Sequence, residues 1–74
     1  MEKKFIKNLK KNMEIEDREL SLSDEFRKYD EWNSLTYLSV IAMLDEEYGI
    51  QIEEDEFKQL RTIGDLLNTV KAKQ

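Results

Sequence analysis

The sequence predicts an all-α fold, a small four-helix bundle with three longer helices and one short helix. Apolar residues recur at spacings of three and four, and no segment alternates like a β-strand for more than a few residues. The 74 residues include no proline, and only Gly49 and Gly64 interrupt the helical pattern. A chain of this length has room for one small core, so we expect a single domain over residues 1–74.

The first helix should cover residues 2–13. Four apolar residues fall on one face there, and five lysines fall on the other. No aromatic residue stands among the lysines, so we interpret their face as solvated surface rather than as a nucleic-acid contact. The apolar face consists of Phe5, Ile6, Leu9 and Met13.

Residues 14–33 form a long polar connection. A connection of this length in a small domain is usually held by its own apolar side chains or has a function. The segment Ser21–Asp24 should form a short turn through a hydroxyl cap. The apolar anchors of the connection are Ile15, Leu20, Leu22, Phe26, Tyr29 and Trp32.

The second long helix should run from Ser34 to about Tyr48, because Asn33 is a good N-cap residue and Gly49 a natural C-terminal stop. It is apolar on nearly all sides, so it is either central to the core or half covered by a partner. The main core stripe should be Leu35, Leu38, Ile41, Ala42, Leu44 and Tyr48, extended by Tyr37, Val40 and Met43. The solvent-exposed side of this helix should hold Thr36, Ser39, Glu46 and Glu47.

The remainder of the chain should hold a short helix and a last long one. The run from Ile50 to Ile52 is too short for a strand. A short helix anchored by Phe57 and Leu60 follows the acidic residues 53–56, and Thr62 with Asp65 reads as a capping box. The last helix should turn Ile63, Leu66, Leu67 and Val70 inward. The core should be walled by Leu38, Ile41, Phe57 and Ile63.

Charge is segregated along a chain whose net charge is −5. Residues 1–13 carry a net charge of +4, residues 14–57 of −12 and residues 58–74 of +3. The acidic middle should repel nucleic acid and attract basic partners. No apolar run is long enough for a signal peptide or a membrane-spanning helix. We therefore expect a monomeric, soluble, cytoplasmic protein that neither binds nucleic acid nor inserts into membranes.

The composition argues against self-contained catalysis. The chain has no cysteine and no histidine, which excludes a disulfide framework, a thiolate metal site and the commonest general base. The acids near Asp45 do not form an EF-hand, since a loop starting there has Ile50 instead of glycine at its sixth position. No glycine-rich loop supports nucleotide binding. We expect neither an enzyme nor a metal site.

Trp32 and Ser34, at the start of the helix 34–48, each allow two interpretations. Trp32 could contact a partner, or it could pack over the helix start near Leu35 or Tyr37. Ser34 could be an ordinary first-turn residue, or its hydroxyl could carry a phosphate. Free amides and the helix dipole at that end favour an anion. Taken alone, both Trp32 and Ser34 more commonly have a structural role.

Residues 26–70 resemble the acyl carrier protein family in the order and spacing of their motifs. The short run around the serine is a weak signal alone, but its combination with the downstream acids and the capping segment is strong. The residues that carry the resemblance are Phe26, Asn33-Ser34-Leu35, Leu38, Ile41, Leu44, Asp45-Glu46-Glu47-Tyr48, Ile50, Ile52, Phe57, Leu60 and Thr62-Ile63-Gly64-Asp65-Leu66.

The resemblance implies a carrier. In the family, a phosphopantetheinyl transferase uses magnesium to move 4′-phosphopantetheine from coenzyme A to the serine hydroxyl, which implies Ser34 as the attachment site. The thiol of this arm then carries acyl intermediates as thioesters between acyl-transferring or condensing enzymes with basic docking patches. The implied docking residues are Leu35, Asp45, Glu46, Glu47, Glu53 and Glu54.

Asn33 departs from the family, in which an aspartate precedes the serine and contacts the transferase. Asn caps a helix as well as Asp does, but it lacks a charge worth about 0.3–1 kcal/mol beside the helix dipole. The efficiency of modification at Ser34 is therefore in question. Thr36 and Ser39 are neutral where fatty-acid carriers are often acidic, and Asp30-Glu31-Trp32 replaces a familiar glycine. These departures favour a dedicated carrier in a specialised fatty-acid, polyketide or related pathway.

The alternative function is a carrier-shaped helical module that is never modified and acts by binding a basic partner. The two functions differ in whether Ser34 accepts the arm.

Overall fold

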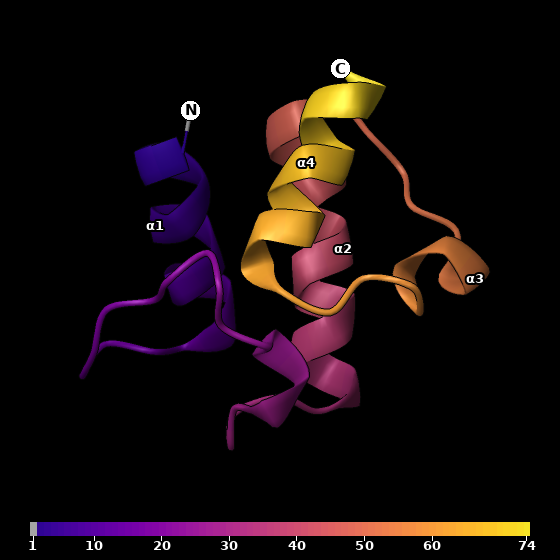
Figure 1. Cartoon of the computed structure of the whole chain (residues 1–74). Helices are drawn as coiled ribbons and strands as arrows, with labels where there is room; N and C mark the ends of the chain where they lie inside the picture. Colours follow the sequence, from indigo (N-terminus) through magenta and orange to yellow (C-terminus); the bar gives the residue numbers. More distant parts are fainter. Residues whose placement is uncertain (1) are drawn as a thin grey trace.

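The computed structural model describes residues 2–74. Three longer helices form the body of the bundle: α1 (Glu2–Met13), α2 (Ser34–Tyr48) and α4 (Ile63–Lys73). α1 is antiparallel to α2 and α4 (Figure 1). The short α3 (Glu54–Phe57) stands at the edge of the molecule opposite α1. Residues 2–74 contain no β-strand, only an isolated bridge between Glu25 and Thr62. The predicted all-α bundle with three longer helices and one short helix is confirmed.

α1 has the predicted bounds and the predicted buried face. Phe5, Leu9 and Met13 are buried, and Ile6 packs partly against the core. The helix ends where Glu14 adopts a left-handed backbone conformation (φ 58°) and the Ile15 N–H donates to the Lys10 carbonyl at 2.9 Å. This bond satisfies a terminal carbonyl and turns Ile15 back into the core.

The connection 14–33 is held by its own side chains, as the sequence predicts. Ile15, Leu20 and Phe26 are buried, and the other three predicted anchors pack partly against the core. The predicted turn at 21–24 forms, but its main side-chain acceptor is the carboxylate of Asp24, which accepts the Ser21 N–H at 3.0 Å. The connection also contains a short 3₁₀ helix, η1 (Phe26–Lys28), which the periodicity does not indicate.

α2 has the predicted bounds, but three of the six residues predicted for its core stripe lie outside the core, whereas Leu44 is buried as predicted. Leu35 is 76% exposed and Leu38 is 59% exposed, and Ala42 is exposed as well. Leu38 therefore does not wall the core. The helix is buried along Val40, Met43 and Leu44, with Tyr37, Ile41 and Tyr48 partly buried.

An aromatic cluster explains the orientation of α2. Tyr37 packs edge-on against Phe57 with ring centroids 5.0 Å apart, and it also meets the Trp32 ring at 6.4 Å. Offset and edge-on aromatic pairs contribute about 0.5–1.5 kcal/mol each beyond the burial of their area. A helix that is apolar on nearly all sides has no strong preferred orientation of its own. Packing of Tyr37 therefore turns Val40 inward and Leu38 outward.

α3 and α4 follow the prediction closely. Phe57 and Leu60 are buried, although α3 itself ends at Phe57. The capping box at the start of α4 forms, because Thr62 Oγ1 accepts the Asp65 N–H and the Asp65 carboxylate accepts the Thr62 N–H, both at 3.1 Å. The Gly64 N–H donates to the Leu22 carbonyl at 2.8 Å, so the start of α4 lies directly against the long connection.

The exposure of Leu38 predicts unequal effects of one substitution at two positions on α2. Leu44→Ala should lower the free energy of unfolding by about 2–5 kcal/mol, because Leu44 is 1% exposed and its loss leaves a cavity. Leu38→Ala should change it by about 0.5 kcal/mol or less. Urea denaturation of the two variants measures both values. Similar losses in the two variants would contradict the observed orientation of α2.

The capping box predicts a pH-dependent contribution from Asp65. Hydrogen bonds from the Thr62 and Arg61 amides lower the pKa of Asp65 below its ordinary value of 3.8. The unfolded state therefore binds this proton more readily, so the stabilisation is present above pH 3.8 and is lost as the pH falls through the folded-state pKa. The difference in unfolding free energy between the wild type and Asp65→Asn should thus be larger at pH 6 than at pH 2.5, by denaturant titration. A difference independent of pH would contradict this assignment.

Candidate functional site

Ser34 is the first residue of α2 and is exposed. Asn33 caps the helix in an extended conformation, and its Oδ1 accepts the Thr36 N–H at 2.9 Å. No acidic side chain lies in the first turn of α2. The hydroxyl of Ser34 therefore stands at the positive end of a 15-residue helix without a neighbouring first-turn carboxylate.

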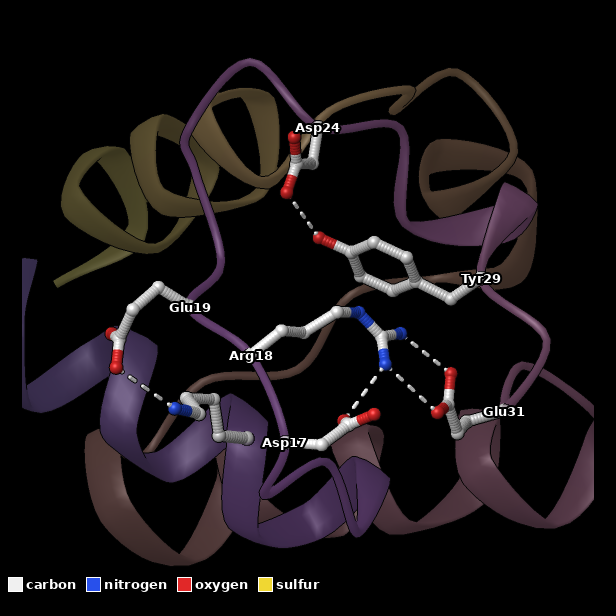
Figure 2. A network of polar contacts seen from close by, with 7 residues as sticks. Asp17, Arg18, Glu19, Asp24, Tyr29 and Glu31 are labelled. Carbon is white, nitrogen blue, oxygen red and sulfur yellow. Dashed lines mark hydrogen bonds and ion pairs between the residues drawn. The ribbon is translucent and has the colours of Figure 1, made fainter.

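Glu31 connects the end of the long connection to the first turn of α2. Its backbone carbonyl accepts the Thr36 hydroxyl at 2.7 Å. Its carboxylate accepts two hydrogen bonds from Arg18, at 3.1 and 2.7 Å, and Figure 2 shows this two-pronged contact. The hydrogen bonds to Arg18 lower the pKa of Glu31 below its ordinary value, so the carboxylate stays ionised at neutral pH.

Arg18 and Tyr29 belong to the same polar network. The guanidinium group of Arg18 lies 5.1 Å from the centroid of the Tyr29 ring, and it also contacts Asp17 at 3.1 Å (Figure 2). The Tyr29 hydroxyl donates to Asp24 at 2.7 Å. Burial, together with this hydrogen bond, raises the pKa of Tyr29, so the phenol remains protonated and continues to donate.

Trp32 packs over the start of α2, which confirms its interpretation as a structural residue. Its ring stacks on Phe57 at 6.1 Å with the planes nearly parallel, and it meets Phe26 edge-on at 5.0 Å. Two residues before Ser34, the chain is therefore anchored to the core. This contact limits how far the Ser34 end of the connection can move.

A stripe of α2 leads from Ser34 to the acidic end of the helix. Because α-helices make one turn in 3.6 residues, Ser34, Leu38, Ile41 and Asp45 lie along one side. A groove of about 330 Å³ follows this stripe between α2 and the segment that leads into α3. Its lining is Leu38, Ile41, Ala42, Asp45, Gln51, Ile52, Glu53 and Glu54. Leu38 thus borders a surface groove, and Ile41 is only half-buried beside it.

The predicted docking residues are all exposed, but they do not gather around Ser34. Leu35 lies next to it, whereas Asp45 begins the last turn of α2, about 16 Å along the helix axis. Glu53 and Glu54 start α3, where Glu54 lies 3.7 Å from Lys58. The acidic residues toward the α2–α3 end, which we call the acidic surface, are Asp45, Glu46, Glu47, Glu53 and Glu54.

Within residues 2–74, no three carboxylates are grouped so that they could hold a metal ion. None of the helices in this range has both the length and the apolar character that crossing a membrane requires.

Sequence reasoning did not identify Arg18 or Glu31 as parts of this site. A weak signal exists, because Arg18 is the only cation between residues 12 and 26 in a strongly acidic stretch. Such a residue is expected to contact a carboxylate, but spacing alone does not tell which one. The pair joins residues 13 positions apart within an irregular segment, where no periodicity applies.

The comparisons with known proteins agree on one family. The model of the phosphopantetheine attachment site family matches residues 3–70. An acyl carrier protein of Lactobacillus acidophilus is 25% identical over 63 residues, which cover 85% of this chain and 79% of that protein. An acyl carrier protein of Chlamydia trachomatis is 36% identical over 42 residues, which cover 57% of this chain and 54% of that protein.

A solved structure supports the same fold. The solution NMR structure of a holo acyl carrier protein from Geobacter metallireducens superposes with a TM-score of 0.82, at 22% sequence identity. The superposition covers 96% of this chain and 82% of that one. Since the family model spans nearly all of the described residues, the chain belongs to the acyl carrier protein family, whose members are carriers with a covalent phosphopantetheine group and not enzymes.

Proposed function

We propose that Ser34 is the residue that receives 4′-phosphopantetheine and that the protein carries acyl intermediates as thioesters on this arm. The observation that carries the proposal is the exposed hydroxyl of Ser34 as the first residue of α2, directly after the Asn33 cap. The family match makes phosphopantetheine the expected group. When bound, the group supplies a thiol, which this cysteine-free chain lacks.

The residues around Ser34 suit a phosphodiester. The amides of the first turn and the dipole of a 15-residue helix favour an anion there. The nearest acid of the network, Glu31, has its charge matched by Arg18. When the hydroxyl oxygen of Ser34 forms its bond to the phosphorus of the arm, the P–O bond of the coenzyme A diphosphate breaks, adenosine 3′,5′-bisphosphate leaves, and the serine proton passes to a base. The first turn of α2 holds no acidic or basic side chain and Glu31 is paired with Arg18, so we assign that base to the transferase.

The groove along α2 is the proposed surface for the acyl chain. Leu38 and Ile41 supply apolar surface on the side of α2 that also holds Ser34. An acyl chain bound along this side would shield side-chain atoms of Leu38 and Ile41 from water. We place the carrier in a specialised fatty-acid, polyketide or related pathway, because Thr36 and Ser39 leave the first turns of α2 uncharged.

The proposed partners are a phosphopantetheinyl transferase and acyl-transferring or condensing enzymes with basic patches. Leu35, 76% exposed, offers an apolar contact next to the attachment residue. The acidic surface at the α2–α3 end offers long-range attraction, which accelerates encounter more than it strengthens the complex. The net charge of −5 disfavours self-association, so we propose a monomer, and we place it in the cytoplasm.

Modification should occur at Ser34 and nowhere else. Incubation with coenzyme A, magnesium and a permissive phosphopantetheinyl transferase should add one phosphopantetheinyl unit, measured by intact mass. Ser34→Ala should abolish the gain, whereas Ser39→Ala, which removes another exposed hydroxyl of α2, should keep it. Asn33→Asp should raise the rate several-fold, since it restores a charge at the cap without losing the acceptor for Thr36. Absence of a gain in both the wild type and Asn33→Asp would disprove the carrier function and leave the unmodified interaction module.

The acidic surface should contribute through electrostatic attraction. Glu46→Gln with Glu47→Gln should lower kcat/KM of the transferase about threefold or more at low salt, and the difference should shrink as salt screens the charges. The matched control is Glu2→Gln with Glu16→Gln, which removes the same charge from exposed positions outside this surface. Equal effects of the two double variants would show that net charge, and not this surface, matters.

A further inference from the structure

The segment that delivers Ser34 is long and irregular. Residues 14–33 join α1 to α2 and contain no glycine or proline, and η1 is their only helical element. A flexible connection of this length samples many conformations, and restraining its end has an entropic cost. Something has to hold its last residues in one orientation before Asn33 can cap α2.

Arg18 reaches across this connection to its last turn. It donates to both carboxylate oxygens of Glu31, and its side chain is 37% exposed against 31% for Glu31. A two-pronged contact between a guanidinium and a carboxylate fixes orientation as well as distance, because both groups are planar. A lysine has one charged centre and fixes only the distance.

The two ends of this contact are themselves anchored. Arg18 lies over the ring of Tyr29, whose hydroxyl is bound to Asp24. The Asp24 carbonyl accepts the Ile63 N–H at 3.0 Å, which ties this part of the connection to the start of α4. On the other side, the Glu31 carbonyl binds the Thr36 hydroxyl in the first turn of α2. The contact therefore links the core of the bundle to the residues on either side of Ser34.

We propose that Arg18 is a positioning residue for the modification of Ser34, because its contact with Glu31 holds residues 31–34 in the orientation that the transferase binds. This inference rests on the proposed function of Ser34. The hydrogen-bond partners of Arg18 are Asp17 and Glu31, and the Ser34 hydroxyl is not among them. Arg18 acts by raising the fraction of molecules whose Asn33–Ser34 junction is competent for binding.

A change in the competent fraction predicts a specific kinetic result. When only a fraction of a protein is competent, the apparent dissociation constant rises in inverse proportion, whereas the bound complex reacts as before. Loss of Arg18 should therefore raise KM of the transferase for the carrier and leave kcat unchanged. Global destabilisation has no such effect while the variant stays folded.

Four variants test the proposal, each assayed at a temperature where circular dichroism shows it fully folded. Arg18→Met should raise KM about three- to tenfold with kcat unchanged, and Arg18→Lys should lie between it and the wild type. The exchange Arg18→Glu with Glu31→Arg should recover most of the loss. The control Lys10→Met removes one positive charge from α1 and breaks its ion pair with Glu19 of the connection, and it should leave KM unchanged.

A second measurement separates this proposal from the assignment of Ser34. Hydrogen exchange of the Thr36 amide, which Asn33 accepts, should accelerate in Arg18→Met, whereas the Val70 amide in the core should not change. If the wild type accepts no phosphopantetheinyl unit, the proposed function fails and with it the role of Arg18 in modification. The exchange result then still decides whether Arg18 orders the junction. An unchanged KM, or an effect of Lys10→Met equal to that of Arg18→Met, would overturn the proposal.

Discussion

The packing of Phe57 is the constraint on which the rest of the structure depends. Its ring meets Phe26 and Trp32 of the connection and Tyr37 of α2, so one buried side chain of α3 joins three segments. Arg27 covers the Phe26 and Phe57 rings and donates to the Phe57 and Leu60 carbonyls. These contacts set the orientation of α2, and that orientation leaves the Ser34 side of the helix facing solvent. A carrier has to keep this side open for its arm and its partners.

Polar contacts set the direction of the chain before Ser34, which aromatic packing alone leaves undetermined. Trp32 holds the connection to the core two residues before Ser34, but a ring contact alone does not set the direction in which the chain leaves. The contact of Arg18 with Glu31 and the bond of Glu31 with Thr36 supply this direction. In a domain with so small a core, partly exposed ion pairs contribute little to stability, so their main effect is on the geometry of the junction.

The charges of the molecule are separated in sequence but only partly in space, because the C-terminal turn of α2 packs against the lysine-bearing α1 through Tyr48. α1 and α3, which begins beside the acids Glu53 and Glu54, stand at opposite edges of the bundle (Figure 1). Between them, the first two turns of α2 present Leu35, Thr36, Leu38 and Ser39 without any charge. A partner that approaches Ser34 therefore meets a neutral, partly apolar surface, while attraction acts from the acidic end about three turns away. In the proposed function, recognition near Ser34 and attraction at a distance therefore depend on different residues.

Local sequence patterns predict the features that act over a few residues. The helix bounds, the Asn33 cap, the Gly49 stop and the capping box of Thr62 and Asp65 follow from side chains within four positions of the groups they bind. The sequence also indicated the family and Ser34 as its candidate residue. Only the tertiary structure decided the orientation of α2 and the partner of Arg18. A helix apolar on nearly all sides can turn several faces inward, and a lone arginine among many acids can pair with several of them. In both cases the outcome depends on contacts between segments that are distant in sequence, and local patterns hold no information about these.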